Sequence, residues 1–392
     1  MVSKPRTWVI ADDLTGAADS GVAFVGAVGS VRLHLRAEVA DSRESLSMIV
    51  LDTDSREADS ADARRRIDVA VAGISPCDVV FKKVDSLMRG QVAVELCALA
   101  DALPDRVLVL CPAVPRQKRL VVDGHIQAEL ADGASLTIGP LEDLITGLRT
   151  RHVTGDASLE LPLALASARS TGTRCLVVDA RTDEELDGIV AAGSAFDSIA
   201  WAGAAGLAGA VARSVTAPDR PRRRDVPDVE RALVVVGSDT EVGRAQGRVL
   251  SESGVLTIAL PAAALALGLR EELDRMATRV ATSLARSSLL VTIDGPVDHA
   301  SRGRVAASLA RVVADALPSA DALVVSGGAT ARSILEHAGV PHLDLVDEIE
   351  PGVVLSTARV GDRDLTVVTK SGSFGDGLTL VRLLGALAKK RG

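Results

Sequence analysis

Two adjacent carboxylates, Asp12 and Asp13, interrupt the first apolar stretch of the chain. The run 8–11 before them predicts a buried strand, and Thr15 and Gly16 begin a helical pattern after them. In open α/β sheets, ligands bind beyond the carboxyl ends of the strands. The two acids could therefore orient or deprotonate a hydroxyl group. A solvated turn or a helix cap is the competing interpretation.

A charged cluster follows another predicted strand, in the sequence FKKVDSLMRG at 81–90. Lys82, Lys83 and Arg89 could hold a carboxylate, because arginine offers a planar fork of donors and lysine a point charge. Asp85 would stay ionised among these cations and is, like the first two acids, a candidate to orient or deprotonate a hydroxyl. A charged loop that satisfies its own ion pairs explains the cluster equally well. Ser86 lies within the same cluster.

Two further strand ends carry polar residues. In DTDSR at 52–56, the pair Asp52 and Asp54 resembles the opening motif of haloacid-dehalogenase-type phosphatases, but Arg56 stands where that motif has Thr or Val. We therefore expect a turn with one ligand-facing arginine, with a phosphatase as the alternative. The segment CPAVPRQKRLVVDGH at 111–125 adds His125, but the chain lacks the G-x-S-x-G motif that would support a catalytic triad.

Glycine-rich turns follow predicted strands in the second half of the chain, at 237–240, 326–330 and 370–376. Glycine lets backbone N–H groups approach phosphate oxygens, and a following helix N-terminus favours negative charge. The chain has neither a Walker A sequence nor G-x-G-x-x-G. Three such turns in one half nevertheless predict a nucleotide site.

The elements that must position these residues alternate along the chain. We expect strands at 7–11, 30–35, 48–52, 79–82, 106–111, 175–179, 198–202, 232–237, 255–259, 288–293, 322–326 and 365–369, with helices between them, such as 61–72 and 91–102. Apolar strands alternating with helices predict an α/β fold with mainly parallel sheets. A segment rich in Pro and charge at 214–230 predicts a linker between an α/β domain at 1–213 and another at 231–392. Two such domains suit a ligand in the cleft between them.

The composition excludes several classes of function. The chain has 392 residues, 47% of them hydrophobic, and a net charge of -8, which argues against nucleic acid as a partner. The longest apolar run, 258–269, contains Pro261 and is too short to span a bilayer. Four cysteines without C-x-x-C or metal spacing fit a reduced cytoplasm, and metal ligands stay unknown. We expect a cytoplasmic protein that binds a small molecule, with no membrane contact. Assembly into a homo-oligomer is compatible with the sequence.

Taken in order, these motifs resemble the four-carbon acid sugar kinase family, long known as a domain of unknown function. The resemblance runs over nearly the whole chain and rests on ADDLTGA, DTDSR, KKVDS followed by RG, CPAVP with DGH, GAAGLA at 203–208, VVGS, SGGATA and KSGSFG. It implies an N-terminal acid-sugar-binding domain and a C-terminal nucleotide-binding domain. It also implies that ATP, with Mg²⁺, phosphorylates a terminal hydroxyl of threonate, erythronate or 3-oxo-tetronate.

The resemblance also implies site residues, carried over by motif. The acid-sugar pocket would be lined by Asp12, Asp13, Arg56, Lys83, Asp85, Ser86 and Arg89, with Lys82 as a further candidate for the substrate carboxylate. ATP would be held by Ser238, Gly327, Gly328, Thr330, Gly352, Gly372 and Gly375.

This chain departs from the family pattern at two positions. Leu87 stands where the family usually has Thr, which removes a hydroxyl and could alter the choice of substrate. Ala329 stands where the family usually has an acid, which could weaken turnover or change how a metal is held. A catalytically impaired protein that binds sugar acid and nucleotide is therefore the second alternative.

Overall fold

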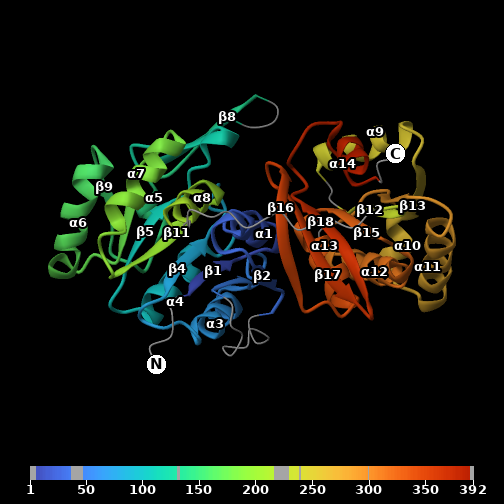
Figure 1. Ribbon diagram of the computed structural model, residues 1–392, viewed down its shortest axis with the longest axis horizontal. Helices are drawn as coiled ribbons and strands as arrows, with labels where there is room; N and C mark the ends of the chain where they lie inside the picture. The colour runs from blue at the N-terminus through green and yellow to red at the C-terminus, as the bar shows by residue number, and fades with distance from the viewer. Residues whose placement is uncertain are drawn as a thin grey trace. The chain divides into compact units, whose positions relative to one another are not determined.

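The computed structural model describes residues 6–36, 47–129, 133–215, 229–237, 240–298 and 300–388 (Figure 1). The chain divides into two compact units, Met1–Arg222 and Arg223–Gly392. Each unit has its own β-strands and its own buried apolar residues. The α/β architecture with mainly parallel sheets is confirmed.

The sheet of the first unit is parallel, with the strand order β2-β3-β1-β4-β11-β5-β10-β9. Its central strands are buried at nearly every position, as their continuous apolar sequences predict. The strands are β1 (Thr7–Ala11), β2 (Val31–His34), β3 (Met48–Asp52), β4 (Val79–Lys83), β5 (Val107–Cys111), β9 (Thr150–Val153), β10 (Cys175–Val178) and β11 (Ile199–Gly203).

Helices cover both faces of this sheet (Figure 1). Helices α3 and α4 pack against each other, and α6, α7, α8 and α1 form a second packed series. The helices are α1 (Leu14–Val22), α2 (Val25–Val28), α3 (Ser60–Val71), α4 (Val92–Ala102), α5 (Leu141–Leu144), α6 (Ala157–Thr171), α7 (Asp183–Gly193) and α8 (Ala205–Ser214). The loops at the carboxyl ends of the strands therefore lead into helices whose N-termini can face a ligand.

A small antiparallel sheet in the first unit was not expected from the sequence. It consists of β6 (Arg119–Val122), β7 (His125–Glu129) and β8 (Ser135–Ile138), and follows a 3-10 turn, η2 (Pro115–Gln117). Side chains alternate between buried and exposed along β7, as in a sheet with one covered face. The segment after β5 is therefore a structured platform and not only a charged loop.

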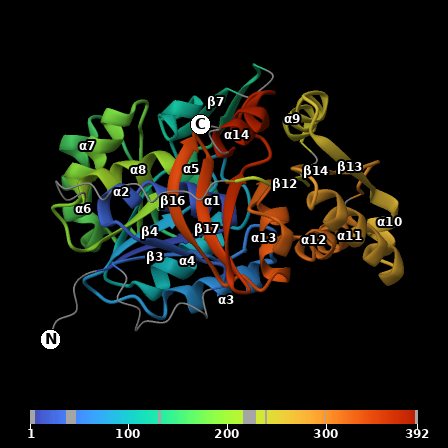
Figure 2. The same ribbon diagram turned by 45° about the vertical axis from the view of Figure 1, so that its right-hand side comes forward.

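The second unit has a mixed sheet, with the order β13-β14-β12-β15-β18-β17-β16. Neighbours from β13 to β18 are parallel, whereas β17 is antiparallel to both β18 and β16 (Figure 2). The strands are β12 (Ala232–Val236), β13 (Leu256–Pro261), β14 (Leu289–Asp294), β15 (Ala322–Ser326), β16 (His342–Glu350), β17 (Val353–Val360) and β18 (Arg363–Lys370). The helices are α9 (Glu241–Glu252), α10 (Ala262–Leu267), α11 (Arg270–Leu284), α12 (Arg302–Ala314), α13 (Gly328–His337) and α14 (Thr379–Leu387), with a 3-10 turn, η3 (Leu317–Ser319).

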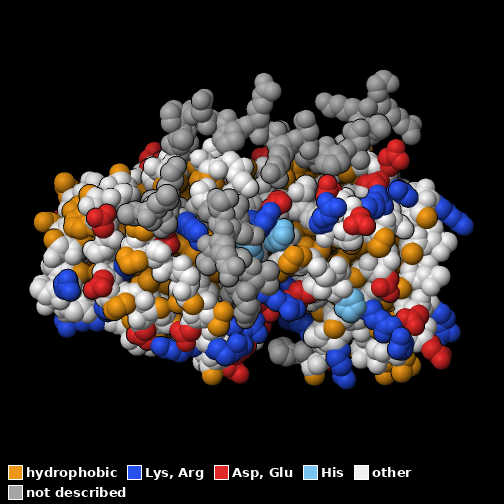
Figure 3. All heavy atoms as spheres, turned by 60° about the horizontal axis from the view of Figure 1, so that its bottom comes forward, with side chains coloured by type: hydrophobic (Ala, Val, Ile, Leu, Met, Phe, Trp, Pro, Cys, Tyr) orange, Lys and Arg blue, Asp and Glu red, His pale blue; other side chains and the backbone are white. Residues whose placement is uncertain are grey.

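The surface mixes charges of both signs. On the face drawn in Figure 3, Lys and Arg side chains lie among Asp and Glu side chains. No helix among the described residues is long and apolar enough to cross a membrane.

Candidate active site

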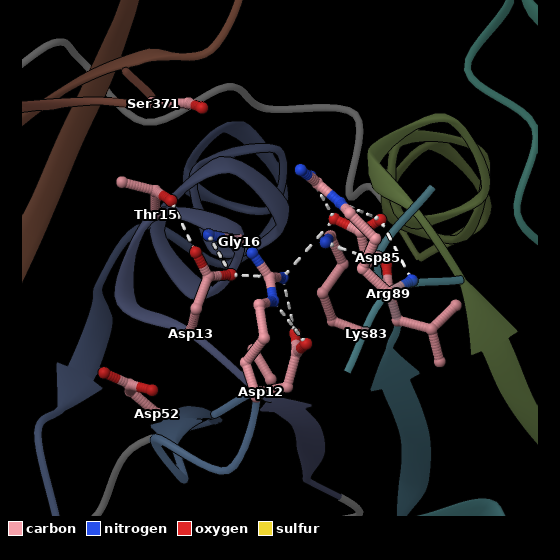
Figure 4. Close-up of polar contacts among 12 residues, drawn as sticks. Asp12, Asp13, Thr15, Gly16, Asp52, Lys83, Asp85, Arg89 and Ser371 are labelled. Carbon is pink, nitrogen blue, oxygen red and sulfur yellow. Dashed lines mark hydrogen bonds and ion pairs between the residues drawn. The ribbon is translucent and has the colours of Figure 1, made fainter. Parts of the chain in front are cut away.

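Three neighbouring strands of the first unit end at the same edge of the sheet. In the order β3-β1-β4, Ala11 is in register with both Asp52 and Lys83. The ends of these strands and the loops that follow them carry acids and cations expected at the site, and Figure 4 shows Asp12, Asp13, Lys83, Asp85 and Arg89 around one cluster. The structure therefore brings together three of the loops that carry the expected site residues.

Arg56 is the centre of this arrangement. Its Nε donates to Asp12 Oδ2 at 2.7 Å and its Nη2 to Asp12 Oδ1 at 2.9 Å, which makes a two-pronged contact. Nη2 also donates to Asp13 Oδ1 at 2.8 Å and lies 3.8 Å from Asp85 Oδ2 (Figure 4). The backbone N–H groups of Ser55 and Arg56 donate to the Asp12 carbonyl oxygen at 3.0 and 3.2 Å. One guanidinium thus links all three candidate catalytic acids.

Asp13 is both a helix cap and a member of this cluster. It is the N-cap of α1, where its side chain accepts from the Gly16 N–H at 3.0 Å and from Thr15 Oγ1 at 2.7 Å. A side chain at Gly16 would place Cβ 2.5 Å from Asp13 Oδ1 and 2.9 Å from Lys83 Nζ. The glycine therefore lets the first turn of α1 approach both charged groups.

Asp85 and Arg89 form a second two-pronged pair. Arg89 Nε donates to Asp85 Oδ1 at 2.9 Å, and Nη2 donates to Oδ2 at 2.7 Å. Asp85 Oδ1 also accepts from the Leu87 N–H at 2.9 Å. Beside this pair, Arg119 Nη1 from the small sheet donates to Ser86 Oγ. The platform formed by β6 therefore adds a guanidinium to the cluster.

The neighbours Lys82 and Lys83 face in different directions, as adjacent residues of a strand do. Lys83 is turned toward Gly16 of α1, and its Nζ donates to the Val84 carbonyl oxygen at 2.9 Å. Lys82 is fully buried, and its Nζ lies 2.9 Å from Glu95 Oε2 on α4. Lys82 therefore lies beneath the cluster, away from its surface.

The cations keep the buried acids ionised. Burial opposes ionisation of Asp12, but Arg56 and the two lysines hold its pKa below the usual value. Burial likewise opposes ionisation of Asp85, and its arginine neighbours lower its pKa well below the usual range. Although burial acts against its charge, the acids raise the pKa of Arg56. The cluster is therefore a set of fixed charges suited to orienting an anion and a hydroxyl.

In the second unit, a cavity of about 390 Å³ opens beside two of the glycine-rich turns. Its lining includes Gly237, Thr240 and residues 327–330. Gly327 has a φ of 115° and is the N-cap of α13, a conformation that favours glycine. A side chain at Gly237 would collide with Thr330. The two turns are thus packed closely where a helix N-terminus faces the cavity.

Other residues expected at the nucleotide hold the neighbouring loops together. Thr240 Oγ1 donates to the Gly372 carbonyl oxygen at 2.7 Å. Gly352 packs against the ring of Phe374, and Gly375 has a φ of 82°. Gly352, Gly372 and Gly375 do not line this cavity, whereas Gly327, Gly328 and Thr330 do. Ser238 lies outside the described residues.

Lys370, the last residue of β18, lies at the base of the same loop. Its Nζ donates to the carbonyl oxygens of Ser371 at 2.7 Å and Phe374 at 2.8 Å. Burial lowers its pKa to about 8. These contacts give the lysine a role in holding the loop that follows β18.

Comparison with known proteins identifies the family. A family model described as a sugar-binding N-terminal domain matches residues 7–141, and one described as a nucleotide-binding C-terminal domain matches 233–380. A D-threonate kinase from Cupriavidus necator is 30% identical over 417 residues, which cover 98% of each chain. The chain belongs to the four-carbon acid sugar kinase family.

Another relative agrees with this assignment, and a solved structure shares the fold. A 3-oxo-tetronate kinase of this family, from Pseudomonas savastanoi, is 24% identical over 95% of each chain. The fold is also that of a Haemophilus influenzae protein of known crystal structure, with a TM-score of 0.72 and 20% identity over 97% of this chain and 100% of that one.

The carboxylates of the D-x-D motif, Asp52 and Asp54, make contacts outside the cluster around Arg56. Asp52 Oδ1 accepts from the Asp54 N–H at 2.9 Å, which closes a local turn. Asp54 has a φ of 51° and its carboxylate lies 3.1 Å from Arg66 Nη1 on α3. The two carboxylates therefore serve the turn and a surface ion pair in this structure.

Sequence reasoning missed two residues of the site. Arg119 is only one of three cations after a strand in the sequence, and its contact with Ser86 depends on the unexpected small sheet. Glu95 falls on the buried face of α4 beside Val92 and Leu99. The sequence does place this acid on the apolar face of a predicted helix. Because charged side chains are buried only with a partner, that position indicates a buried ion pair.

Proposed function

We propose that this protein transfers the terminal phosphoryl group of ATP to the terminal hydroxyl of a four-carbon acid sugar. The domain at 1–213 would bind the sugar acid, the domain at 231–392 would bind the nucleotide, and 214–230 would link them. The observation that carries the proposal is the contact of Arg56 with Asp12, Asp13 and Asp85 at the carboxyl edge of the sheet. Such a cluster offers fixed cations to a carboxylate and fixed anions to a hydroxyl.

The substrate carboxylate would bind Arg56 and Lys83. Arg56 uses Nε and Nη2 for the acids, and its Nη1 makes no hydrogen bond among the described residues. Lys83 Nζ spends one donor on the Val84 carbonyl oxygen. Arg89 and Ser86 would contact the rest of the substrate from the loop after β4. Lys82 would not bind the substrate carboxylate, because its ammonium is fully buried beside Glu95.

Asp13 or Asp85 would orient the attacking hydroxyl, whereas Asp12 would hold Arg56. Both carboxylate oxygens of Asp12 face Arg56, and its side chain is 1% exposed, compared with 18% for Asp13 and 6% for Asp85. Phosphoryl transfer has a loose transition state, so placement and charge matter more than a strong base. Asp85, whose pKa is lowered by its arginine neighbours, can meet this requirement.

The nucleotide phosphates would approach the turns at Gly327, Gly328 and Thr330, with Ser238 as a further contact. Backbone N–H groups at the start of α13 provide the donors and the favourable dipole. The base would lie on aliphatic side chains of the same cavity, such as Ile293 and Leu309.

Mg²⁺ would bind mainly through the nucleotide phosphates. Among the described residues, no group of three or more His, Cys, Asp or Glu side chains could hold a metal ion. Mg²⁺ commonly takes only one or two carboxylates and fills its shell with phosphates and water, so these residues are compatible with it. The metal would neutralise charge on the transferring phosphoryl group. We also propose a cytoplasmic location, because the cysteines of the described chain are free.

D-threonate is the first substrate to test, because the D-threonate kinase relative is the more similar of the two full-length relatives compared above. The experiment is an ADP-release assay with ATP and Mg²⁺ over D- and L-threonate, D- and L-erythronate and 3-oxo-tetronate. Saturable release with one acid supports the proposal and names the substrate. Binding of acid and ATP without release would instead support an impaired binding protein, for which Ala329 at the cavity wall is the observation in favour. Release of phosphate from a phosphorylated acid without ATP would support a phosphatase.

A further inference from the structure

A buried polar cluster lies directly beneath the three strand ends. Glu95 on α4 is fully buried; its Oε2 lies 2.9 Å from Lys82 Nζ, and its Oε1 accepts from Ser55 Oγ. Thr53 Oγ1 lies 2.7 Å from Ser55 Oγ and donates to the Ala11 carbonyl oxygen at 2.8 Å. One carboxylate is therefore connected to the carboxyl ends of β1, β3 and β4.

Both direct partners of Glu95, Ser55 and Lys82, precede a residue of the site in the chain. Ser55 precedes Arg56 in the chain, and the Ser55 N–H donates to the Asp12 carbonyl oxygen at 3.0 Å. Lys82 precedes Lys83, and its Nζ donates to the Lys83 carbonyl oxygen at 2.8 Å. A shift of the buried carboxylate would thus move the backbone of both cations that we assign to the substrate carboxylate.

We propose that Glu95 is a positioning residue that sets the relative placement of Arg56 and Lys83. The proposal rests on the proposed function, because those two cations are assigned there to the acid sugar. A buried ion pair is a costly way to stabilise a fold, and apolar residues of similar volume often serve as well or better. The contacts of this pair with two strand ends give it a second use, namely to fix the geometry of the site. A misplacement of about 1 Å at a site can cost roughly 100-fold in rate.

The test compares Glu95→Gln with the double variant Glu95→Gln/Lys82→Met. The single change leaves the ammonium of Lys82 buried without its counter-charge, so it should lower stability and reduce kcat/KM for the acid sugar roughly 10- to 100-fold. The KM for ATP should not change. The double change leaves no charge at positions 82 and 95, so stability should recover while kcat/KM for the acid stays low. Recovery of both would overturn the proposal, because the pair would then serve only the fold.

A matched control lies at the other end of β4. Asp78 is a buried carboxylate that accepts from Trp8 Nε1 at 2.9 Å and from the Arg6 N–H at 2.9 Å. Asp78→Asn should lower stability without a change in the acid-sugar KM. A rise in the acid-sugar KM equal to that of Glu95→Gln would overturn the proposal, because any loss of stability would then be enough to weaken binding of the acid sugar.

Two further measurements cover failure to fold and failure of the proposed function. Ser55→Ala removes one donor to Glu95 and keeps the ion pair, so the variant should fold and still have a raised KM for the acid sugar. A wild-type KM would overturn the proposal. Hydrogen exchange without substrate should be faster at 53–56 and 82–86 in Ser55→Ala and Glu95→Gln. Unchanged exchange there would also overturn it. A wild-type protein that phosphorylates no acid sugar would refute the proposed function, while the exchange result would still decide the role of Glu95.

Discussion

Replacement of Arg56 by lysine keeps the positive charge but removes the planar set of donors. Arg56 makes three charge-assisted hydrogen bonds, two to Asp12 and one to Asp13. A single ammonium could replace about one of them at this position, so two would be lost, at roughly 1.5–3 kcal/mol each. Asp12 is 1% exposed and would regain little solvation. Because the charge itself remains, we expect a loss of about 3 kcal/mol in the free energy of unfolding, at the low end of this range.

The assay combines thermal unfolding with steady-state kinetics of the Arg56→Lys variant. We expect a lower Tm and an acid-sugar KM raised roughly 100-fold, because the carboxylate loses its oriented partner, with the KM for ATP unchanged. Arg64→Lys on α3 is the matched control, because its ion pair with Asp101 is exposed and should contribute little to stability. A variant of Arg56 with wild-type stability and wild-type KM for every acid would refute the reasoning.

Three other predictions test separate parts of the structure. Asp85→Asn should lower kcat by roughly 10²-fold or more while the protein stays folded; if steady-state kinetics give a wild-type rate, this acid is not used. Gly16→Ala would place Cβ 2.5 Å from Asp13 Oδ1 and should raise the acid-sugar KM, whereas Gly26→Ala, with nothing within 4 Å, should not; equal KM values would contradict the close approach. The pKa of Lys370 falls from 10.5 to about 8, so the unfolded chain holds the proton more tightly and stability should rise as pH increases from about 8 to 10.5. Chemical denaturation across this range should show a gain of up to about 3 kcal/mol, which Lys370→Met should abolish; the same gain in that variant would show that another group is responsible.

The sequence predicted the elements that carry the site because their patterns are unambiguous. Strand β1 (Thr7–Ala11) and strand β3 (Met48–Asp52) are continuous apolar runs ending at acids, and both were placed correctly. Parallel strands bring their carboxyl ends to one edge, so the meeting of three motif loops followed from the fold class. The residue patterns and the order of the motifs were therefore sufficient to indicate the α/β class and the family.

Other features depend on contacts that a linear sequence does not show. Lys82 and Lys83 are neighbours of the same residue type, and only the packing of α4 and α1 decides which one faces Glu95 and which one faces Gly16. Strands β16 and β17 were missed. In β16, the acidic alternation of HLDLVDEIE at 342–350 does not resemble the continuous apolar runs of the parallel strands. The contact of Arg119 with Ser86 requires the small antiparallel sheet, whose strands were not expected from the sequence.

The most direct test of the central claim is phosphorus NMR of a reaction of the wild-type protein with ATP, Mg²⁺ and D-threonate, repeated with the other four-carbon acids. The account predicts that one acid gains a phosphate ester on its terminal carbon as ATP is converted to ADP in equal amount. ADP with only inorganic phosphate, or unchanged ATP with every acid, would contradict the claim that this chain is an acid sugar kinase.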